Sequence, residues 1–413
     1  MSAPTRADCV AMDGRDPLGR LRDRFSIRAG LVYLDGNSLG ALPKTTASAL
    51  LDVVDRQWGE DLIGSWNANG WMQAPARVGG KIARLIGAQA DEVIVADSTT
   101  VNLFKLVQGA LRLREGRTTI LTEPGNFPTD LHVLEGVAAG SDGGVRVKRV
   151  ARAALADAID ERTALVMLTH VHYKSAEIWP MAEITARAHA AGALVLWDLS
   201  HSAGALRVDL GAAGADLAVG CGYKHLNGGP GAPSFVFVAR GLQEPLFNPI
   251  WGWLGHAAPF DFGDEHQPAA GIARQLCGTP PILALAALEC GVESFDGVDM
   301  AEVEAKARGL GELFRELVQT RCAGHGLTLA SPVDPNRRGA HIAFAHPDGY
   351  ALIQALIARG VIGDFRAPDI LRFGFTALYL RHVDVWDAVE ALRQVLEARE
   401  HERPEFRQRQ AVT

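Results

Sequence analysis

The chain has 413 residues, which is long enough for a large hydrophobic core and for two domains. Its net charge of −7, with no dense block of lysine and arginine, argues against a nucleic-acid partner. The N-terminus lacks the apolar core of a signal peptide and no apolar run could cross a bilayer, so we expect no membrane partner. Five cysteines without paired spacing favour neither a disulfide framework nor a zinc site, as expected for a cytoplasmic protein.

The N-terminal part of the chain predicts short helices and two unusual turns. We expect one helix at 17–25 and another from Pro43 to about residue 59, because proline suits the first helical turn. Between them, the Gly/Asn/Ser turn at 36–40 offers the hydroxyl of Ser38. Residues 60–71 are rich in tryptophan and asparagine. Tryptophans in a loop are unusual unless they cover an apolar surface, which could be a ligand or a neighbouring domain.

Apolar strands alternate with helices from about residue 90 to residue 240, which predicts an α/β fold with a mostly parallel sheet covered on both faces. In such a sheet, ligands bind at the edge where the carboxyl ends of the strands meet. Polar residues follow most of the strands, so we expect one site at that edge. The strands are expected at 93–96, 119–122, 165–169, 193–197 and 234–238.

Two strand ends carry residues suited to a flat, phosphorylated ligand. The hydroxyl-rich turn at 97–100 precedes a helix, whose free N–H groups and dipole favour an anion; a simple helix cap has the same sequence, and both roles can hold at once. Phe127 could clamp a flat cofactor or pack in the core, and Asp130 could contact that cofactor or cap a helix. His170 and His172 have no further ligands nearby, so we expect no metal site.

One lysine, Lys224, lies among glycines at 220–231, directly after an apolar segment. Glycines allow close approach of the backbone to a ligand, and a partly desolvated amine can attack a carbonyl carbon. Lys224 is therefore either a Schiff-base lysine or an incidental lysine in a surface turn. Asp198 favours the first interpretation, because a pyridoxal 5'-phosphate (PLP) site needs a carboxylate to keep the pyridine nitrogen protonated. The alternative for Asp198 is a helix cap.

The C-terminal half predicts a long loop and a smaller α/β domain. Residues 245–281 are irregular and rich in aromatic residues, glycine and proline, and loops of this length are usually functional. Arg372 lies in an apolar strand; a buried arginine needs a carboxylate or phosphate partner, and no internal partner is evident. We expect strands at 327–330, 341–345 and 371–375, helices at 281–293, 303–320, 350–359 and 383–400, and a frayed tail after Pro404.

Taken in order, these motifs resemble the fold-type I PLP enzymes of the aminotransferase class V group, and more closely the bacterial kynureninases. The resemblance extends from about residue 33 to about residue 374. It implies a large domain with a seven-stranded, mostly parallel sheet and a smaller C-terminal α/β domain. Its most specific pieces are Phe127-Pro128-Thr129-Asp130, Asp198-Leu199-Ser200-His201, Gly222-Tyr223-Lys224, the Trp-Gly-Trp-Leu-Gly-His run at 251–256 and the Gly-Thr-Pro-Pro run at 278–281.

We expect three regions: an N-terminal segment at 1–60 that packs with the small domain, a large PLP-binding domain at 61–295, and the small domain at 296–413. The resemblance implies that Lys224, Tyr223 and Asp198 are catalytic. It also implies a set of residues that contact PLP: Thr99, Thr100, Phe127, Pro128, Thr129, Asp130, Thr169, Asp198, His201, Tyr223, Lys224, Trp253 and Thr279.

The resemblance further implies the substrate contacts and a homodimer. Arg372 would grip the substrate's α-carboxylate, Ser38 and His256 would line the pocket, and Trp66 would lie beside the substrate's aromatic ring. Trp253 and Thr279 would contact the cofactor phosphate of the partner subunit, which places the active sites at the interface of the homodimer.

The implied reaction is PLP-dependent hydrolytic Cβ–Cγ cleavage of L-kynurenine to anthranilate and L-alanine, in tryptophan degradation. Trp66 and Thr279 match the bacterial pattern, which favours kynurenine over 3-hydroxykynurenine. Two other functions stay open. A cysteine desulfurase or selenocysteine lyase would need a mobile cysteine, for which Cys322 beside two glycines is the loose candidate. A non-enzymatic PLP-binding homologue would need a DNA-binding segment or a damaged site, and the chain has neither a basic winged segment nor a missing catalytic group.

Overall fold

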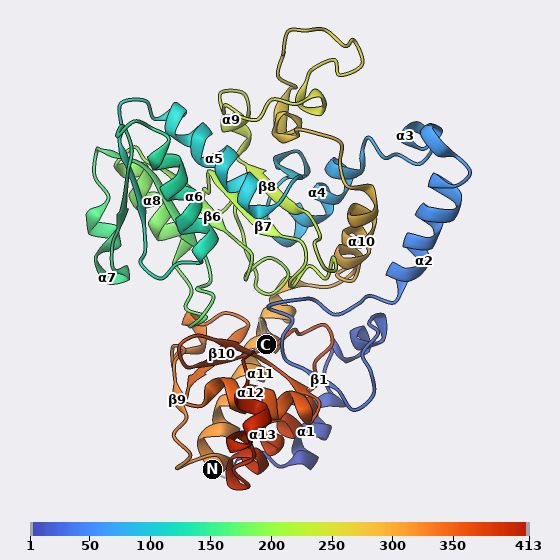
Figure 1. Ribbon diagram of the computed structural model, residues 1–413, viewed down its shortest axis with the longest axis vertical. Coiled ribbons are helices and arrows are strands. Elements are labelled where there is room, and N and C mark those ends of the chain that lie inside the picture. The colour runs from blue at the N-terminus through green and yellow to red at the C-terminus, as the bar shows by residue number, and fades with distance from the viewer. Residues whose placement is uncertain (1–2, 410–413) are drawn as a thin grey trace.

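The computed structural model describes residues 3–409 and has a seven-stranded sheet at the centre of its large domain (Figure 1). The strand order is β2-β8-β7-β6-β5-β3-β4, and only β8 runs antiparallel to its neighbours. This is the mostly parallel sheet that the alternation of strands and helices predicts. The strands are β2 (Val93–Val95), β3 (Thr119–Thr122), β4 (Arg146–Arg149), β5 (Thr163–Thr169), β6 (Leu194–Asp198), β7 (Leu217–Cys221) and β8 (Ser234–Val238).

Apolar side chains cover both faces of this sheet, and its central strands β5 and β6 are buried at every position. Within β5, Leu165 and Met167 join one core cluster, whereas Val166 and Leu168 join the other, as the period of two along a strand requires. Helices α5 (Thr99–Leu113) and α6 (Pro128–Ala139) cover the first face. The second face is covered by α4 (Ala74–Leu85), α8 (Met181–Ala190) and α10 (Ile282–Glu293).

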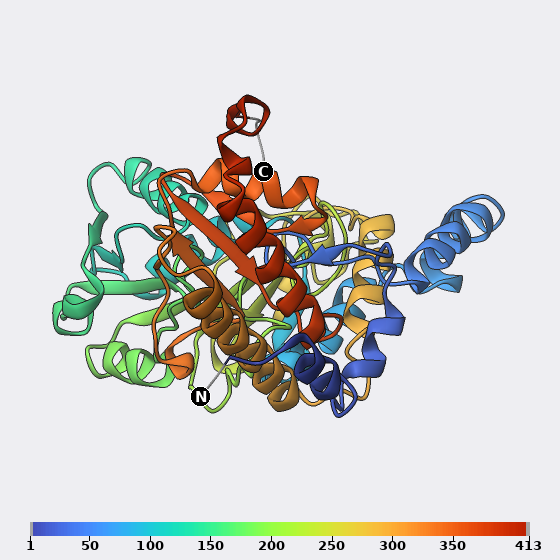
Figure 2. The same ribbon diagram turned by 90° about the horizontal axis from the view of Figure 1, so that it is seen from below.

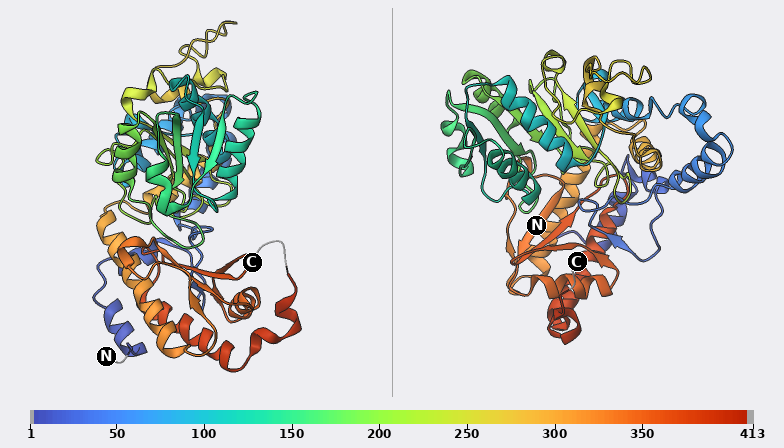
Figure 3. Two further views of the ribbon diagram at one scale, coloured as in Figure 1. Left: turned by 90° about the vertical axis from the view of Figure 1, so that its left-hand side faces the viewer. Right: turned by 45° about the horizontal axis from the view of Figure 1, so that its top comes forward.

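The small domain is built on a four-stranded antiparallel sheet with the order β12-β13-β10-β9. Figure 3 shows this domain stacked below the large one. The sequence predicts β9, β10 and β13 but misses β12, which has only three residues. The strands are β9 (Thr328–Leu329), β10 (His341–Ala345), β12 (Asp364–Arg366) and β13 (Ile370–Gly374), and the helices are α11 (Met300–Arg321), α12 (Gly349–Ala358), α13 (His382–Glu397) and the single turn α14 (Pro404–Arg407).

The segment from residue 3 to about residue 33 packs against the small domain. Helix α1 (Arg6–Asp13), which the sequence does not predict, lies against α13, with an ion pair of 2.7 Å between Arg6 and Asp387. Strand β1 (Val32–Tyr33) pairs in parallel with β11 (Val361–Ile362). The predicted helix at 17–25 is a shorter 3₁₀ helix (Gly19–Arg24), and the helical turn α14 begins the tail that was expected to be frayed; residues 410–413 of that tail lie outside the described residues.

Two segments project away from the body of the large domain. One contains α2 (Thr45–Asp52), its π-helical continuation (Val53–Trp58) and α3 (Ser65–Ala68), and Figure 2 shows it as an arm at one side. The other is the long loop between 245 and 281, which rises above the sheet in Figure 1. The helix expected at 43–59 therefore begins at Thr45 and changes its winding at Val53. No helix within residues 3–409 is both long and apolar enough to span a membrane.

Candidate active site

A cavity of about 140 Å³ lies at the carboxyl ends of the parallel strands. Its size is close to that of an engineered cavity of about 150 Å³ that holds a benzene ring. The cavity brings together residues from five separate segments, which the sequence predicts to meet at this edge. Its lining consists of Ser98, Thr99, Thr100, Phe127, Thr129, Thr169, Asp198, Ser200, His201, Tyr223 and Lys224.

Lys224 is buried in this cavity and follows the end of β7. Its Nζ lies 3.0 Å from Nε2 of His201 and 5.5 Å from the ring centroid of Phe127. Burial, together with the positive charge of Lys224, holds the pKa of His201 well below its ordinary value. A neutral His201 can accept a hydrogen bond from the lysine ammonium group, so the pair fixes the direction in which the amine points.

A glycine of the N-terminal turn ties the Ser38 turn to the Lys224 loop. The N–H of Gly40 donates to the carbonyl oxygen of Tyr223 at 2.8 Å. A Cβ at position 40 would lie 2.4 Å from the carbonyl oxygen of Lys224, so only glycine permits this approach. The turn that carries Ser38 therefore packs directly against the Lys224 loop.

Two buried carboxyl groups lie beneath the cavity. Asp198 ends β6 and accepts the Ser200 N–H at 2.7 Å, and burial raises its pKa. Asp130 begins α6 and accepts the hydroxyl of Thr169 at 2.9 Å. Burial and the neighbouring Asp198 raise the pKa of Asp130 well above its ordinary value. Within residues 3–409, the buried Oδ1 of Asp130 has no hydrogen-bonding partner.

The first turn of α5 lines the same cavity and is suited to an anion. Ser98 caps the helix by accepting the Val101 N–H at 3.4 Å. The free N–H groups of this turn and the hydroxyls of Thr99 and Thr100 face the cavity, and the helix dipole favours a negative charge there. Below the turn, the fully buried ammonium of Lys105 pairs with Asp97 at 2.7 Å, a contact that the sequence analysis missed.

These residues fit PLP. The cofactor needs an anion site for its phosphate, an apolar face for its ring, a carboxylate for its ring nitrogen and a lysine for its aldehyde. The first turn of α5, Phe127, Asp198 and Lys224 supply these groups in one cavity. The unpartnered Oδ1 of Asp130 is a further sign that a polar group of a ligand belongs here.

Arg372 does have an internal partner, which corrects the expectation from sequence. Its Nε donates to Asp364 at 2.8 Å and its Nη2 to Ser38 at 2.9 Å, and β12 and β13 place Asp364 opposite Arg372. Its Nη1 donates to the carbonyl oxygen of Tyr173 at 2.6 Å. The Tyr173 ring meets Phe127 edge-on with 5.3 Å between ring centroids, so the Arg372 cluster adjoins the cofactor cavity.

Four predicted residues lie away from both the Lys224 cavity and the adjoining Arg372 cluster in the single chain. Trp66 lies on α3 in the projecting arm, where its ring meets Trp71 at 5.6 Å. Trp253 and Thr279 are exposed on the long loop, and Nε2 of His256 is 3.1 Å from the carbonyl oxygen of Glu265 in the same loop. Within one chain, these four residues therefore do not lie in the same site as Lys224.

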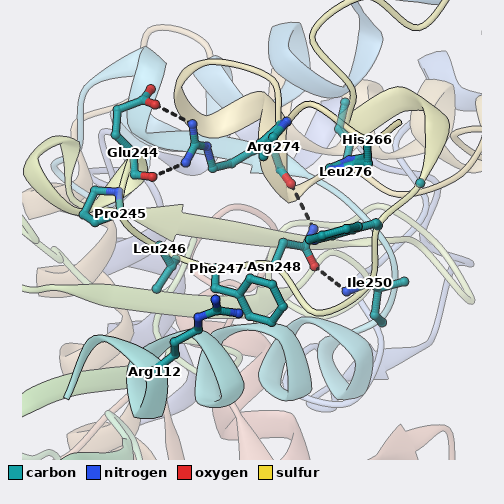
Figure 4. Close-up of a pocket in the computed structure, with 13 residues that line it drawn as sticks. Arg112, Glu244, Pro245, Leu246, Phe247, Asn248, Ile250, His266, Arg274 and Leu276 are labelled. Carbon is teal, nitrogen blue, oxygen red and sulfur yellow. Dashed lines mark hydrogen bonds and ion pairs between the residues drawn. The ribbon is translucent and has the colours of Figure 1, made fainter. Parts of the chain in front are cut away.

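A second cavity, of about 210 Å³, lies at the base of the long loop (Figure 4). Its walls are held by contacts between the ends of the loop: Arg274 pairs with Glu244, and the Asn248 side chain donates to the carbonyl oxygen of Arg274 at 2.9 Å. The Arg112 guanidinium of α5 lies 4.2 Å from the ring centroid of Phe247. These contacts anchor the loop on the large domain.

All five cysteines are buried and unpaired. Burial raises the pKa of Cys322 to about 12, so this thiol is neither exposed nor ionised. A desulfurase needs a reactive thiolate on a mobile segment, and Cys322 does not provide one. The groups of three or more histidine, cysteine and carboxylate side chains that a metal requires are also absent from residues 3–409.

The family model described as the kynureninase C-terminal domain matches residues 303–392. A kynureninase from Pseudomonas fluorescens is 48% identical over 414 residues, which cover 99% of this chain and all of that protein. A kynureninase from Burkholderia pseudomallei (strain K96243) is equally similar over the same shares.

Solved structures share the fold at low identity. A cysteine desulfurase from Escherichia coli superimposes with a TM-score of 0.76 at 20% identity, over 92% of this chain and 98% of that one. A C-DES mutant with glycine covalently linked to its PLP cofactor has a TM-score of 0.77 at 18% identity, over 90% and 98%. These matches establish the type I fold of PLP enzymes. Because full-length relatives at 48% identity carry the more specific information, the chain belongs to the kynureninase family.

Proposed function

We propose that this protein is a PLP-dependent hydrolase that cleaves L-kynurenine between Cβ and Cγ, giving anthranilate and L-alanine. The observation that carries the proposal is the 48% identity to kynureninases over the full length of both chains. The cavity around Lys224 supports it, because a lysine, a carboxylate, an aromatic ring and a hydroxyl-rich helix start line one space. The buried cysteines speak against the desulfurase alternative.

PLP, when bound, supplies an electron-poor ring that stores the electron pair released at the substrate's Cα. The first turn of α5 and the neighbouring His201 would hold its phosphate, and Phe127 would lie against its ring. Asp198 would keep the ring nitrogen protonated, and Asp130, with Thr169 beside it, would reach the polar edge of the ring. Pro128 and Thr129 complete the turn that carries Asp130.

The residues of the chain move the protons. Lys224 would take the proton from Cα as the general base, with neutral His201 orienting its amine. Burial raises the pKa of the Tyr223 phenol, so this group stays protonated and can donate to the oxygen of the substrate's γ-carbonyl. Water adds to that carbonyl carbon, the Cβ–Cγ bond breaks, and anthranilate leaves with the γ-carbon and the hydroxyl of the water. Cβ takes up a proton from that water, and Lys224 returns the proton to Cα to complete L-alanine.

The substrate's α-carboxylate would meet Arg372 and Ser38. We assign Trp66, His256, Trp253 and Thr279 to the active site of the partner subunit in a homodimer. The apolar side chains of the two projecting segments support this: Ile63 is 81% exposed and Phe262 is 80% exposed. Such exposed apolar surfaces are typical of interfaces.

Three further parts of the proposal rest on the same reasoning. Trp66 and Thr279 would favour kynurenine over 3-hydroxykynurenine in tryptophan degradation. The unpaired cysteines favour a reducing cytoplasm. The divisions 1–60, 61–295 and 296–413 are supported by the contacts of α1 and β1 with the small domain, although α2 packs on α10 of the large domain.

The test combines the absorbance of the purified protein with the fluorescence of released anthranilate. The PLP-loaded protein should absorb in the visible range and release anthranilate and L-alanine from L-kynurenine. The Lys224→Ala variant should lose at least about a thousand-fold in turnover, because it removes the general base. An exposed control, Lys148→Ala, should behave like the parent protein. Release of L-alanine from L-cysteine but no anthranilate from kynurenine would overturn the proposal.

A further inference from the structure

The neighbour of Arg372 in the carboxylate cluster is a second arginine that the proposed function does not use. Arg366 lies on β12, and its Nη2 is 2.8 Å from Oδ2 of Asp364, the same oxygen that Arg372 contacts. Its Nη2 also donates to the hydroxyl of Ser38 at 3.3 Å. Two guanidinium groups therefore converge on one carboxylate and one hydroxyl.

The two arginines differ in how many donors they have left. A guanidinium has five N–H groups. Arg372 commits four of them, two to Asp364, one to Ser38 and one to the carbonyl oxygen of Tyr173, and its side chain is only 2% exposed. Arg366 is 33% exposed, and its Nε donates to no group within residues 3–409. Arg366 is therefore better placed than Arg372 to donate hydrogen bonds to a ligand.

The charges of the cluster do not cancel. Besides the two guanidiniums it contains Asp364 and Asp35, and Tyr33, Tyr173 and the neutral His201 and His341 surround it. The arginines hold the pKa of Asp364 at about 2 against its burial, so Asp364 is ionised. Burial and the neighbouring Asp364 raise the pKa of Asp35 to about 8, so Asp35 is uncharged at neutral pH. One positive charge remains without a partner, at a place that suits an anion.

This surplus charge adjoins the cofactor cavity. Lys174 follows Tyr173 in the chain, and its Nζ donates to the carbonyl oxygen of Ala367 at 2.9 Å. This bond holds the segment after Arg366 close to Tyr173. The Tyr173 ring meets Phe127, which lines the cavity. A substrate amino acid held in the cavity beside Lys224 would have its α-carboxylate near this region.

We propose that Arg366 is a substrate-binding residue, which shares the α-carboxylate of the substrate with Arg372. In this arrangement Asp364 and Ser38 hold both guanidiniums side by side, and the carboxylate supplies the negative charge that the cluster lacks. The inference rests on the proposed function, because it takes kynurenine as the source of that carboxylate.

The test compares Arg366→Gln and Arg366→Lys with two controls, Arg359→Gln and Arg359→Lys. Arg359 is a matched control, because its side chain is 31% exposed and paired with Glu400 on the same domain, away from Asp364. We expect Arg366→Gln to raise KM for L-kynurenine by about 10–100-fold, the loss typical of a charge-assisted hydrogen bond, with kcat within about threefold. Arg366→Lys, which keeps the charge, should fall between the parent and Arg366→Gln.

A second ligand separates a direct contact from a structural effect. The decarboxylated analogue of kynurenine lacks the α-carboxylate, so its inhibition constant should stay within about twofold in both Arg366 variants. Equal weakening of kynurenine and the analogue, or a KM within twofold of the parent in Arg366→Gln, would overturn the inference. If the parent protein itself released no anthranilate, the proposed function would fail instead. A titration with L-alanine, followed by cofactor absorbance, would then test the carboxylate contact by itself.

Discussion

Asp198 and Asp130 share one buried compartment, yet the proposed chemistry asks different things of them. Asp198 must carry a negative charge beside the cofactor's ring nitrogen. Burial and the neighbouring Asp198 raise the pKa of Asp130 well above its ordinary value, which favours the protonated form that a neutral amide can imitate. Replacing each aspartate with asparagine, which has the same shape but no charge, can therefore distinguish a role that needs a charge from one that does not.

We expect Asp198→Asn to lower kcat for kynurenine by about 100-fold or more, because the ring nitrogen loses its charged partner. Asp130→Asn should lower kcat by less than about tenfold, because it replaces one neutral group with another. Steady-state release of anthranilate measures both. Equal losses in the two variants would contradict this division of roles.

Asp35 makes the stability of the protein depend on pH. Its folded-state pKa of about 8 lies above the ordinary value of an aspartate, so the native state keeps a proton that the unfolded chain has lost. Stability should therefore fall as the pH rises from about 4 through 8. The pKa of Asp364 is shifted in the opposite direction, to about 2, so Asp364 changes the stability only below about pH 4.

The variant Asp35→Asn should remove this pH dependence. Between pH 5.5 and pH 8.5, the Tm of the parent should fall by about 2–4 °C more than the Tm of the variant. Thermal unfolding at the two pH values measures this, with the exposed Asp261→Asn as the control. Parallel changes in the parent and the variant would show that Asp35 does not bind the proton.

At the scale of elements, Lys105 fastens the start of α5 to the long loop. Its fully buried Nζ pairs with Asp97 before the helix and donates at 2.7 Å to the carbonyl oxygen of Gln275. The anion site at the first turn of α5 thus depends on a lysine almost two turns further along the helix.

Replacing Lys105 with Met should cost about 3–5 kcal/mol of unfolding free energy, the range for removing one partner of a buried ion pair, and should weaken PLP binding. Urea denaturation and a PLP titration measure the two effects. Lys81→Met removes a lysine from partly exposed pairs with Glu289 and Glu293 and should cost about 1 kcal/mol or less. Unchanged PLP affinity in Lys105→Met would show that the ion pair of Lys105 with Asp97 does not support the cofactor site.

The elements also explain which parts of the site could be predicted. Asp198 and Lys224 are readable from sequence because each follows an apolar strand, and a parallel sheet brings such ends together. Asp364 is not readable in this way, because β12 has three residues and only the antiparallel register places Asp364 opposite Arg372. Lys105 was missed because one lysine on a helix usually faces solvent.

For the whole molecule, we predict that the exposed apolar side chains of the two projecting segments hold a dimer together. The double variant Ile63→Asp/Phe262→Asp should sediment as a monomer and lose most of its activity with Lys224 intact, because the charges would be buried at the interface. Val333→Asp is the control, since Val333 is 69% exposed on the small domain. A fully active monomer would rule out a shared active site.

Shared active sites also predict rescue between two inactive variants. Lys224→Ala removes a residue of one chain's cavity, and Trp253→Ala would remove a residue that acts in the partner's cavity. After the two are mixed and refolded together, mixed dimers would contain one intact site. Anthranilate release should then rise well above that of either variant alone, toward about a quarter of the parent activity if exchange is random. If the mixture is no more active than either inactive variant alone, Trp253 acts within its own subunit.

Trp66, Trp253, His256 and Thr279 could not be placed by the folding of one chain, since they lie on the segments that leave the body of the domain. The family resemblance implies a contact with a second subunit for Trp253 and Thr279, and we propose the same for Trp66 and His256. Sequence patterns report which strands and helices a chain forms, because these arise from contacts within it. They contain no comparable periodic signal for contacts between copies.

The pairing of β1 with β11 has a consequence for the making of this protein. The ribosome produces residues 32–33 more than 300 residues before their partners at 361–362. At about 5–20 residues per second, the N-terminal segment waits roughly 15 s to 1 min for the strand that it joins. The large domain can form during that interval, whereas the small domain and the carboxylate cluster can be completed only at the end of translation. A chain cut short before Asp364 would therefore contain every residue that lines the cofactor cavity but lack the arginines proposed to bind the substrate's carboxylate.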